Sequence, residues 1–223
     1  MFDNIAPTYD RLNHLLSMNI DRLWRRRAVR LAARTSPRRI VDMATGTGDL
    51  AIALARRIPQ AEVVGADLSP EMLAEARRKI ARAGLEERIT LTECDADATG
   101  METASADVVT VAFGVRNFAD PMRGLAELLR ILRPGGEIVV LEISNPRNPV
   151  VRLFYRLYFH RILPAVGAAL SHDGSAYRYL PASVDAFASP GEFVGMLTRA
   201  GFADAAAESL SCGIATIYTA RKR

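Results

Sequence analysis

The chain has 223 residues, of which 49% are hydrophobic and 24% are charged, and its formal net charge is +4. This length fits one large domain with a single hydrophobic core, and this composition excludes a disordered chain, collagen and a coiled coil. The positive charge favours anionic partners without identifying them.

Short β-branched runs alternate with helical patterns along most of the chain. Helical periodicity appears first at Arg22–Ala33. Strands are predicted at Ile40–Ala44, Glu62–Ala66, Ile89–Glu93, Val108–Phe113, Glu137–Ile143, Ala205–Leu210 and Gly213–Ala220. Further helices are predicted at Asp49–Arg57, Pro70–Ala83, Pro121–Leu132 and Pro190–Ala200. This alternation predicts an α/β fold with a parallel sheet covered by helices on both faces.

Two segments fall outside this alternation. Residues 1–36 precede the first strand, and residues 144–188 form a stretch too long for a plain loop. We therefore divide the single domain into an N-terminal helical lid at 1–36, a cofactor-binding core at 37–143, a substrate or membrane insertion at 144–188, and a closing helix with two strands at 189–223. The lid and the insertion are expected to enclose the substrate.

The chemistry begins in the glycine loop that follows the first strand. Gly46 and Gly48 allow a tight turn against a ligand, and a helix begins at Asp49. Together with Ala51, the loop also fits a loose GxGxxA pattern. The loop alone therefore does not separate a dinucleotide from another adenosine ligand.

Acidic residues at the strand ends discriminate between these ligands. Asp67 ends the second strand, where its carboxylate can accept both ribose hydroxyls of either ligand. Asp49 would repel a pyrophosphate, whereas Asp42 and Asp49 would attract the ammonium group of a sulfonium ligand. Asp95 ends the third strand, in a position to meet an adenine edge. Asp49 as a helix N-cap and Asp95 as a turn residue are the ordinary alternatives, but together the acids favour S-adenosylmethionine.

Longer motifs resemble a known family. The stretches Asp42–Asp49, Asp67–Met72, Ala112–Asn117, Leu132–Gly136 and Leu141–Ser144 resemble the class I methyltransferases. Within that class the chain is similar to the ubiquinone/menaquinone biosynthesis C-methyltransferase family, which the outer motifs Met1–Asp10, Leu23–Arg25, Ser175–Leu180 and Cys212–Thr216 also resemble. The resemblance covers essentially the whole chain. It implies a Rossmann-like, seven-stranded and mostly parallel sheet whose last strand is antiparallel.

The resemblance also implies S-adenosylmethionine as the cofactor. The residues that it implies in cofactor binding are Tyr9, Met43, Gly46, Thr47, Gly48, Asp49, Asp67, Leu68, Asp95, Ala96 and Ala112. Two positions depart from the family pattern. Ala112 lacks the hydroxyl that a serine would supply, and Ala44 takes the first position of the glycine loop.

The activity implied by the resemblance is methyl transfer to a ring carbon of a reduced polyprenyl quinone precursor, with demethylmenaquinol as the expected acceptor. A quinone ring carbon is electron-poor, whereas a quinol, and still more its phenolate, can attack the sulfonium methyl. Since a phenol with a pKa of about 10 is mostly protonated at neutral pH, the site has to stabilise the anion or accept its proton. Another small phenolic or sterol-like acceptor is the alternative.

Arg116 and Asn117, just beyond the fourth strand, are the first predicted catalytic residues. A fixed guanidinium beside the phenolic oxygen would lower the pKa of the phenol without giving up its own proton. Alternatively, Arg116 pairs with Asp120 or Glu142 and only holds the loop.

The insertion contains candidates for the proton acceptor. His172, Asp173 and Tyr177 lie together there, and we take Asp173 and Tyr177 as further catalytic candidates. Each of them also fits a helix cap or a surface position.

The segment Val150–Leu170 indicates how a quinol in a bilayer is reached. Arg152, Arg156 and His160 recur every four residues as a basic stripe, and leucine, phenylalanine and tyrosine occupy the other faces. Its arginines exclude a membrane-spanning helix and favour an interfacial helix on anionic headgroups. A pocket for the prenyl tail is the alternative role of the aromatic residues.

Other partners are constrained by what the sequence lacks. Basic residues cluster at Arg25–Arg27 and in the insertion, without the aromatic stacking platform or basic groove that nucleic-acid-binding proteins show, so we expect no nucleic-acid partner. Cys94 and Cys212 stand in no metal-binding spacing, and we predict neither a disulfide nor a metal site. Because Met1–Asp10 has no apolar signal segment, a cytoplasmic location is expected. The sequence does not decide whether the protein forms a homo-oligomer.

Overall fold

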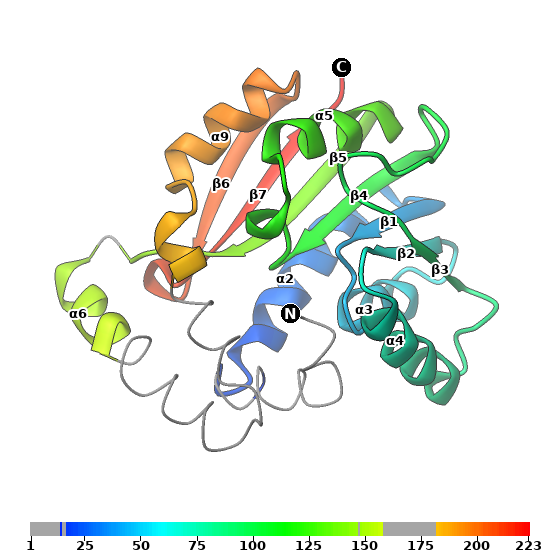
Figure 1. The fold of residues 1–223 in the computed structure, drawn as a ribbon, viewed down its shortest axis with the longest axis horizontal. Helices are drawn as coiled ribbons and strands as arrows, with labels where there is room; N and C mark the ends of the chain where they lie inside the picture. Colours follow the sequence, from blue (N-terminus) through cyan, green and yellow to red (C-terminus); the bar gives the residue numbers. More distant parts are fainter. Residues whose placement is uncertain (1–13, 15–16, 147, 158–181) are drawn as a thin grey trace.

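A seven-stranded sheet runs through the centre of the molecule (Figure 1). The computed structural model describes residue 14 and residues 17–146, 148–157 and 182–223. The strand order across the sheet is β3-β2-β1-β4-β5-β7-β6. The order of the strands reverses between β1 and β4, which lie side by side, and such a switch point is where ligands bind in open α/β sheets.

Strands β1 to β5 run parallel, and β7 runs antiparallel to its neighbours β5 and β6. The expected reversal of the last strand is therefore confirmed. The strands are β1 Arg39–Met43, β2 Glu62–Asp67, β3 Ile89–Glu93, β4 Ala106–Ala112, β5 Leu132–Ile143, β6 Ala203–Leu210 and β7 Ala215–Arg221.

The helices begin where side-chain caps and prolines favour a first turn. The Ser69 hydroxyl accepts a hydrogen bond from the Met72 backbone N–H at 3.2 Å, and the Asp120 carboxylate accepts one from that of Met122 at 2.9 Å. The helices are α2 Ile20–Ala32, α3 Asp49–Arg57, α4 Pro70–Ala83, α5 Pro121–Ile131, α6 Pro149–Leu157 and α9 Pro190–Arg199, with short 3-10 helices η2 Ala33–Thr35, η3 Val115–Asn117 and η5 Ser211–Gly213. Residues 182–186 form a further helical turn.

Helices cover both faces of the sheet, as predicted. α2, α3 and α4 lie on one face, and α5 and α9 lie on the other (Figure 1). Consecutive residues of one strand pack against helices on opposite faces, because side chains alternate across a sheet. Ile40 and Val108 pack on the α2 side, whereas Val41 and Val109 pack on the α5 side, and all four are fully buried. Two covered faces explain why the strands read as continuous apolar runs.

Most strand boundaries differ from the prediction by one or two residues, and the start of β5 differs by five. The starts of β5 and β7 have identifiable causes. β5 begins at Leu132 instead of Glu137, because Leu132 already pairs with Ala106 of β4 before the register shifts. β7 begins at Ala215 instead of Gly213, which closes the η5 turn with a φ of 93° that no strand adopts. Both corrections come from local irregularities of pairing that hydrophobic periodicity does not record.

Candidate active site

A pocket of about 370 Å³ lies at the carboxyl ends of β1 to β4. Loops that are distant in sequence come together there, because the carboxyl ends of parallel strands meet at one edge of the sheet. The predicted site residues that line it are Met43, Gly46, Asp67, Leu68, Asp95, Ala96, Ala112 and Asn117. The pocket therefore has the position expected for the ligand of this fold.

The lining does not include every predicted site residue that the structure describes. Thr47, Gly48, Asp49 and Arg116 are described by the structure but are not part of the pocket lining. Tyr9, Asp173 and Tyr177, and also His172, lie outside the described residues.

The sequence interpretation missed part of the pocket lining. The additional lining residues are Ala44, Ser69, Met72, Cys94, Phe113, Gly114, Phe118 and Ala119. Each of them follows one of the strands β1 to β4 closely or belongs to the first turn of the next helix. Most have side chains without distinctive chemistry, so position at a strand end was the signal that could have found them.

Asp67 links two loops of the pocket. Its Oδ2 accepts a hydrogen bond from the Gly46 backbone N–H at 2.8 Å, and its Oδ1 accepts one from the Ser69 backbone N–H at 3.0 Å. The carboxylate therefore fixes the glycine loop against the loop after β2. Leu68 next to it is 64% exposed and presents an apolar side chain to the pocket.

Asp42, in β1, holds the glycine loop through buried hydrogen bonds. The side chain is 1% exposed, and its two oxygens accept hydrogen bonds from the hydroxyls of Thr110 at 2.6 Å and Thr45 at 2.7 Å. Burial raises the pKa of Asp42 to about 6, although these two hydrogen bonds act in the opposite direction. Asp42 thus holds Thr45, in the turn of the loop, without lining the pocket.

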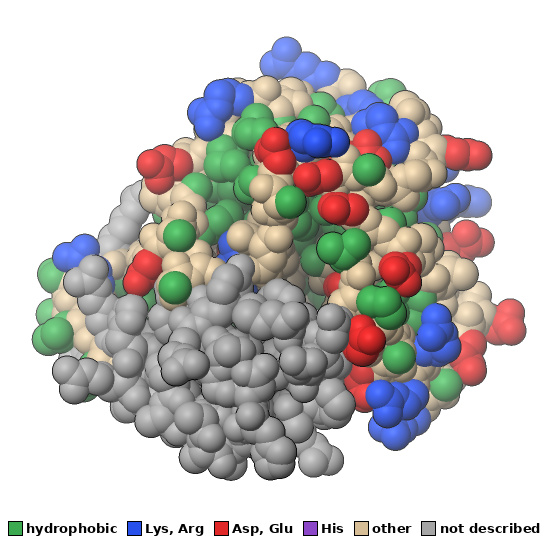
Figure 2. Space-filling model, viewed as in Figure 1, with side chains coloured by type: hydrophobic (Ala, Val, Ile, Leu, Met, Phe, Trp, Pro, Cys, Tyr) green, Lys and Arg blue, Asp and Glu red, His purple; other side chains and the backbone are tan. Residues whose placement is uncertain are grey.

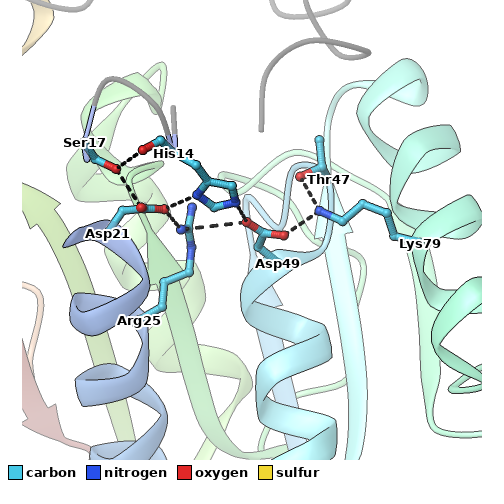
Figure 3. A network of polar contacts seen from close by, with 7 residues as sticks. All are labelled: His14, Ser17, Asp21, Arg25, Thr47, Asp49 and Lys79. Carbon is cyan, nitrogen blue, oxygen red and sulfur yellow. Dashed lines mark hydrogen bonds and ion pairs between the residues drawn. The ribbon is translucent and has the colours of Figure 1, made fainter. Parts of the chain in front are cut away.

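Asp49 belongs to a network of charged side chains (Figure 3). Its carboxylate lies 2.5 Å from Lys79 Nζ, 3.3 Å from His14 Nε2 and 3.8 Å from Arg25 Nη1. Burial acts to raise the pKa of Asp49, but the charges of Arg25 and Lys79 outweigh it and hold this pKa below its usual value. Gly48, with a φ of 82°, is the N-cap of α3, so Asp49 is the first helical residue and not the cap. The carboxylate expected to attract the ligand's ammonium group is thus shared among basic side chains of the protein.

The loops after β1 and β4 touch at Gly114. A Cβ atom added to Gly114 would overlap the Cβ atom of Ala44. Ala44 itself has a φ of 54°, in the left-handed region that favours glycine. The two loops that form this part of the pocket therefore have no room for one more methyl group.

Replacing Gly114 by alanine is expected to lower the free energy of unfolding by about 1–3 kcal/mol, the scale of overpacking a tight contact. Chemical denaturation measures this change. Adding Ala44→Gly should recover most of the loss, because it removes the overlapping methyl group and relieves the positive φ. A double variant no more stable than Gly114→Ala would show that this contact is not the cause.

Arg116 is buried beside the pocket, in the η3 turn. Its Nη1 donates hydrogen bonds to Glu142 Oε1 at 2.6 Å and to the Phe113 carbonyl oxygen at 2.5 Å, and its Nε donates to the Ser183 hydroxyl at 3.3 Å. The structure therefore contains the pairing with Glu142 that the sequence left as an alternative. Because Asn117 in the same turn and Phe113 just before the turn line the pocket, this anchoring fixes part of the pocket wall.

Burial dominates the electrostatics around Arg116. It raises the pKa of Glu142, which is fully buried, although the charge of Arg116 acts against this rise. Burial likewise raises the pKa of Tyr155, on α6, above its usual range. The Tyr155 phenol therefore stays protonated and uncharged at neutral pH, and the Glu142 carboxylate is paired with the guanidinium.

The strand order, the glycine loop after β1 and the carboxylate at the end of β2 together define a class I methyltransferase with a Rossmann-like fold. The sequence profile described as the ubiE/COQ5 methyltransferase family matches residues 1–222. The chain belongs to this family.

Individual relatives support the same conclusion. The demethylmenaquinone methyltransferase of Thermus thermophilus is 52% identical over 218 residues, which cover 98% of each chain. The ubiquinone/menaquinone biosynthesis C-methyltransferase UbiE of Syntrophotalea carbinolica is 47% identical over 219 residues, which cover 98% of this chain and 91% of that one. The solved structure of human N-acetylserotonin methyltransferase in complex with SAM has a TM-score of 0.62 at 22% identity, over 88% of this chain and 51% of that one, and shows the fold alone.

These findings confirm the sequence-based predictions of family, fold and enzyme class. The protein is an S-adenosylmethionine-dependent C-methyltransferase that acts in quinone biosynthesis. The alternative of an unrelated phenolic or sterol-like acceptor is not favoured.

Proposed function

We propose that the enzyme methylates a ring carbon of demethylmenaquinol and so forms menaquinol. The observation that carries this proposal is the pocket at the switch point, in a chain 52% identical to a protein named demethylmenaquinone methyltransferase. Methyl transfer forms a carbon–carbon bond, breaks the carbon–sulfur bond of the sulfonium, and releases the ring proton.

The pocket lining fits S-adenosylmethionine, which supplies an electrophilic methyl group when bound. Carboxylates at two strand ends, Asp67 and Asp95, suit ribose hydroxyls and the amino edge of adenine respectively. The exposed Leu68 and the buried Ala96 offer apolar surface to a ring between them. We assign Met43, Gly46 and Ala112 to the same ligand, because they line the pocket along β1 and β4.

We further propose that Arg116 and Asn117 serve the acceptor. Asn117 lines the pocket, and the Arg116 guanidinium is held close behind it by Glu142. A fixed positive charge near the phenolic oxygen lowers the pKa of the phenol and makes the ring carbon more nucleophilic. Asp173 and Tyr177 remain the proposed candidates for the proton acceptor.

A direct assay tests this proposal. Purified enzyme with methyl-labelled S-adenosylmethionine is offered a reduced naphthoquinol, a reduced benzoquinol and a non-quinol phenol in parallel. Label is expected in the naphthoquinol ring, and the quinone form should accept none. Transfer only to the simple phenol would contradict the proposal.

Replacing Asp67 by alanine is expected to weaken S-adenosylmethionine binding about tenfold or more, since a hydrogen bond to a charged group contributes roughly 1.5–3 kcal/mol. Calorimetry measures the dissociation constant. Glu93→Ala is a matched control, because Glu93 is the exposed β3 neighbour of Asp67 and does not line the pocket. Equal affinities of Asp67→Ala and the native enzyme would remove Asp67 from the cofactor site.

We also propose that α6 collects the quinol from an anionic membrane surface. Three apolar side chains spaced along α6 are strongly exposed: Val150 at 62%, Leu153 at 68% and Leu157 at 54%. Figure 2 shows hydrophobic side chains over α6, at the left of the view. Arg152 is exposed on the same helix, whereas Tyr155 is buried. An exposed apolar face beside a basic residue favours an interfacial helix. Within the described ranges, no helix has the length and apolar character needed to cross a bilayer.

Liposome sedimentation tests this interfacial role. The enzyme is expected to sediment with anionic vesicles, and binding should weaken with salt. Arg152→Glu plus Arg156→Glu should reduce binding while activity on a short-tailed, soluble quinol is retained. The same charge change at the exposed Arg56 and Arg57 of α3 is the control. No vesicle binding at low salt would favour the other role, a pocket for the prenyl tail.

The remaining assignments follow from this scheme. We propose that residues 1–36 act as a lid, 37–143 bind the cofactor, 144–188 receive the substrate, and 189–223 close the sheet. A cytoplasmic enzyme at the inner face of the membrane fits this division, and size-exclusion chromatography with light scattering tests for a homo-oligomer.

A further inference from the structure

α2 reaches the cofactor end of the sheet through Arg25. Its guanidinium pairs with Asp21 one turn earlier and lies 3.8 Å from Asp49 Oδ2 at the start of α3 (Figure 3). It also lies over the ring of Phe113, 5.3 Å from the ring centroid. Arg25 therefore contacts residues that follow β1 and β4, the two strands that flank the switch point.

The position of this guanidinium is tightly fixed. The side chain of Arg25 is only 14% exposed, and that of Asp21 only 5%. Asp21 also accepts a hydrogen bond from the Ser17 hydroxyl at 2.6 Å and lies 2.7 Å from His14 Nδ1. A planar guanidinium that is paired at one edge and stacked on a ring loses the freedom of an ordinary surface arginine.

Phe113 carries this constraint to the pocket. Phe113 lines the pocket and has a φ of 60°, a conformation that bulky residues rarely adopt. The ring of Trp24 lies beside it, with centroids 6.3 Å apart, and the Trp24 indole N–H donates to the Ser211 hydroxyl at 2.9 Å. Unfavourable backbone conformations persist where the surroundings fix them, and here Trp24 and Arg25 are those surroundings.

We propose that Arg25 is a positioning residue for the S-adenosylmethionine site. It does not line the pocket. It acts through Asp49 and Phe113 and holds the glycine loop and the Phe113 side of the pocket at a fixed distance from each other. This inference rests on the proposed assignment of the pocket to S-adenosylmethionine.

The surroundings of Asp49 separate positioning from simple charge neutralisation. Without Arg25, Asp49 would still lie 2.5 Å from Lys79 Nζ, and Lys79 would still donate to the Thr47 hydroxyl oxygen at 3.2 Å. The carboxylate would therefore keep a cation. The Phe113 ring, by contrast, would no longer have a guanidinium packed over it, so the main consequence is geometric.

The test compares Arg25→Met with Arg26→Met. Arg26 is the next residue of α2 and is exposed, so it controls for loss of an arginine from this helix. We expect Arg25→Met to raise the dissociation constant and the KM for S-adenosylmethionine roughly five- to twentyfold, the range for removing a cation–π interaction and weakening an ion pair. The kcat should stay within about twofold, because the acceptor groups are untouched. Arg26→Met should change neither.

A double-mutant cycle with Phe113→Leu identifies the route of this effect. If Arg25 acts through the Phe113 ring, the two changes together weaken binding by less than the product of their separate effects. If Arg25→Met does not fold, Arg25→Lys serves instead, because it keeps the charge and loses the planar stacking, and it should raise KM in part.

Two results overturn the inference in distinguishable ways. Native affinity for S-adenosylmethionine in a folded Arg25→Met or Arg25→Lys variant would reject the role of Arg25 while the pocket assignment stands. No binding of S-adenosylmethionine by the native enzyme would reject the pocket assignment together with the inference.

Discussion

Arg116→Met is expected to lower the free energy of unfolding by about 3–5 kcal/mol, because it leaves a buried carboxylate without its cation. Glu142 is fully buried and the side chain of Arg116 is only 5% exposed, so little water can reach the carboxylate to replace the lost charge. If Arg116 also stabilises the developing phenolate, turnover should fall far more than cofactor affinity. Chemical denaturation and steady-state kinetics measure the two effects separately.

The pH dependence of the variant identifies the buried carboxyl. Burial raises the pKa of Glu142 in the native protein. Only the charge of Arg116 and the hydrogen bonds that the Glu142 carboxylate accepts oppose this rise. Without Arg116 the carboxyl takes up a proton at higher pH, and burying the neutral acid costs less. The stability deficit of Arg116→Met should therefore shrink as the pH falls from about 8 to about 5.

Arg116→Met combined with Glu142→Gln provides the control. A glutamine keeps an acceptor for the backbone N–H of Ile143, which donates to Glu142 at 2.9 Å, but carries no charge. Stability should recover substantially while turnover stays low. Failure of the double variant to regain stability would exclude the buried charge as the cause, and native turnover in Arg116→Met would exclude a catalytic role.

Asp42→Asn is expected to stabilise the fold by about 1–3 kcal/mol at neutral pH, the free energy that corresponds to a pKa raised from 3.8 to about 6. Because the native state binds this proton more tightly than the unfolded state, the carboxyl lowers stability as the pH rises from about 4 to about 6, and the loss stays constant above. Asparagine removes the charge and can still bond to Thr45 and Thr110, since a hydroxyl both donates and accepts.

Asp107→Asn is the matched control, with the opposite sign. Burial acts to raise the pKa of Asp107, but hydrogen bonds from the backbone N–H groups of Arg39 and Arg38 and the charge of Arg133 hold it below its usual value. Its stabilising effect is present at neutral pH and is lost as the pH falls through that lowered pKa. Asp107→Asn should therefore destabilise the protein at about pH 7.5, and urea denaturation at several pH values distinguishes the variants. A less stable Asp42→Asn at this pH would contradict the expectation.

Local signals explain why much of the fold could be predicted. The predicted helices Asp49–Arg57 and Pro70–Ala83 and the strand Ile89–Glu93 agree with the structure to the residue. α4 is bounded by Pro70 at its start and by Gly84, which takes the left-handed conformation after its end. Such signals lie within a few residues of the boundary, whereas the early start of β5 depends on a partner strand.

The candidate site was predictable only where topology alone decides. Asp67 and Asp95 end neighbouring parallel strands, so both had to reach the same edge of the sheet. The partner of Arg116 was not decidable, because Glu142 stands on another strand and the sequence offers Asp120 equally. The Arg25 contact with Phe113 joins positions far apart in sequence and follows from no spacing rule.

The position of β7 between β5 and β6 bears on how the chain completes its fold during synthesis. Strands β1 to β4, whose carboxyl ends form the pocket, are all made by residue 112, whereas β7 follows at Ala215–Arg221. Until β7 emerges, the hydrogen-bonding edge of β5 is open and β6 has no neighbour, and such edges promote aggregation. Strands β1 to β4 can thus assemble early from contacts close in sequence. The part of the sheet formed by β5 and β6 is complete only after β7 has been made and has inserted between them. Any truncation that removes β7 would expose this edge on a sheet whose ligand-binding end is otherwise complete.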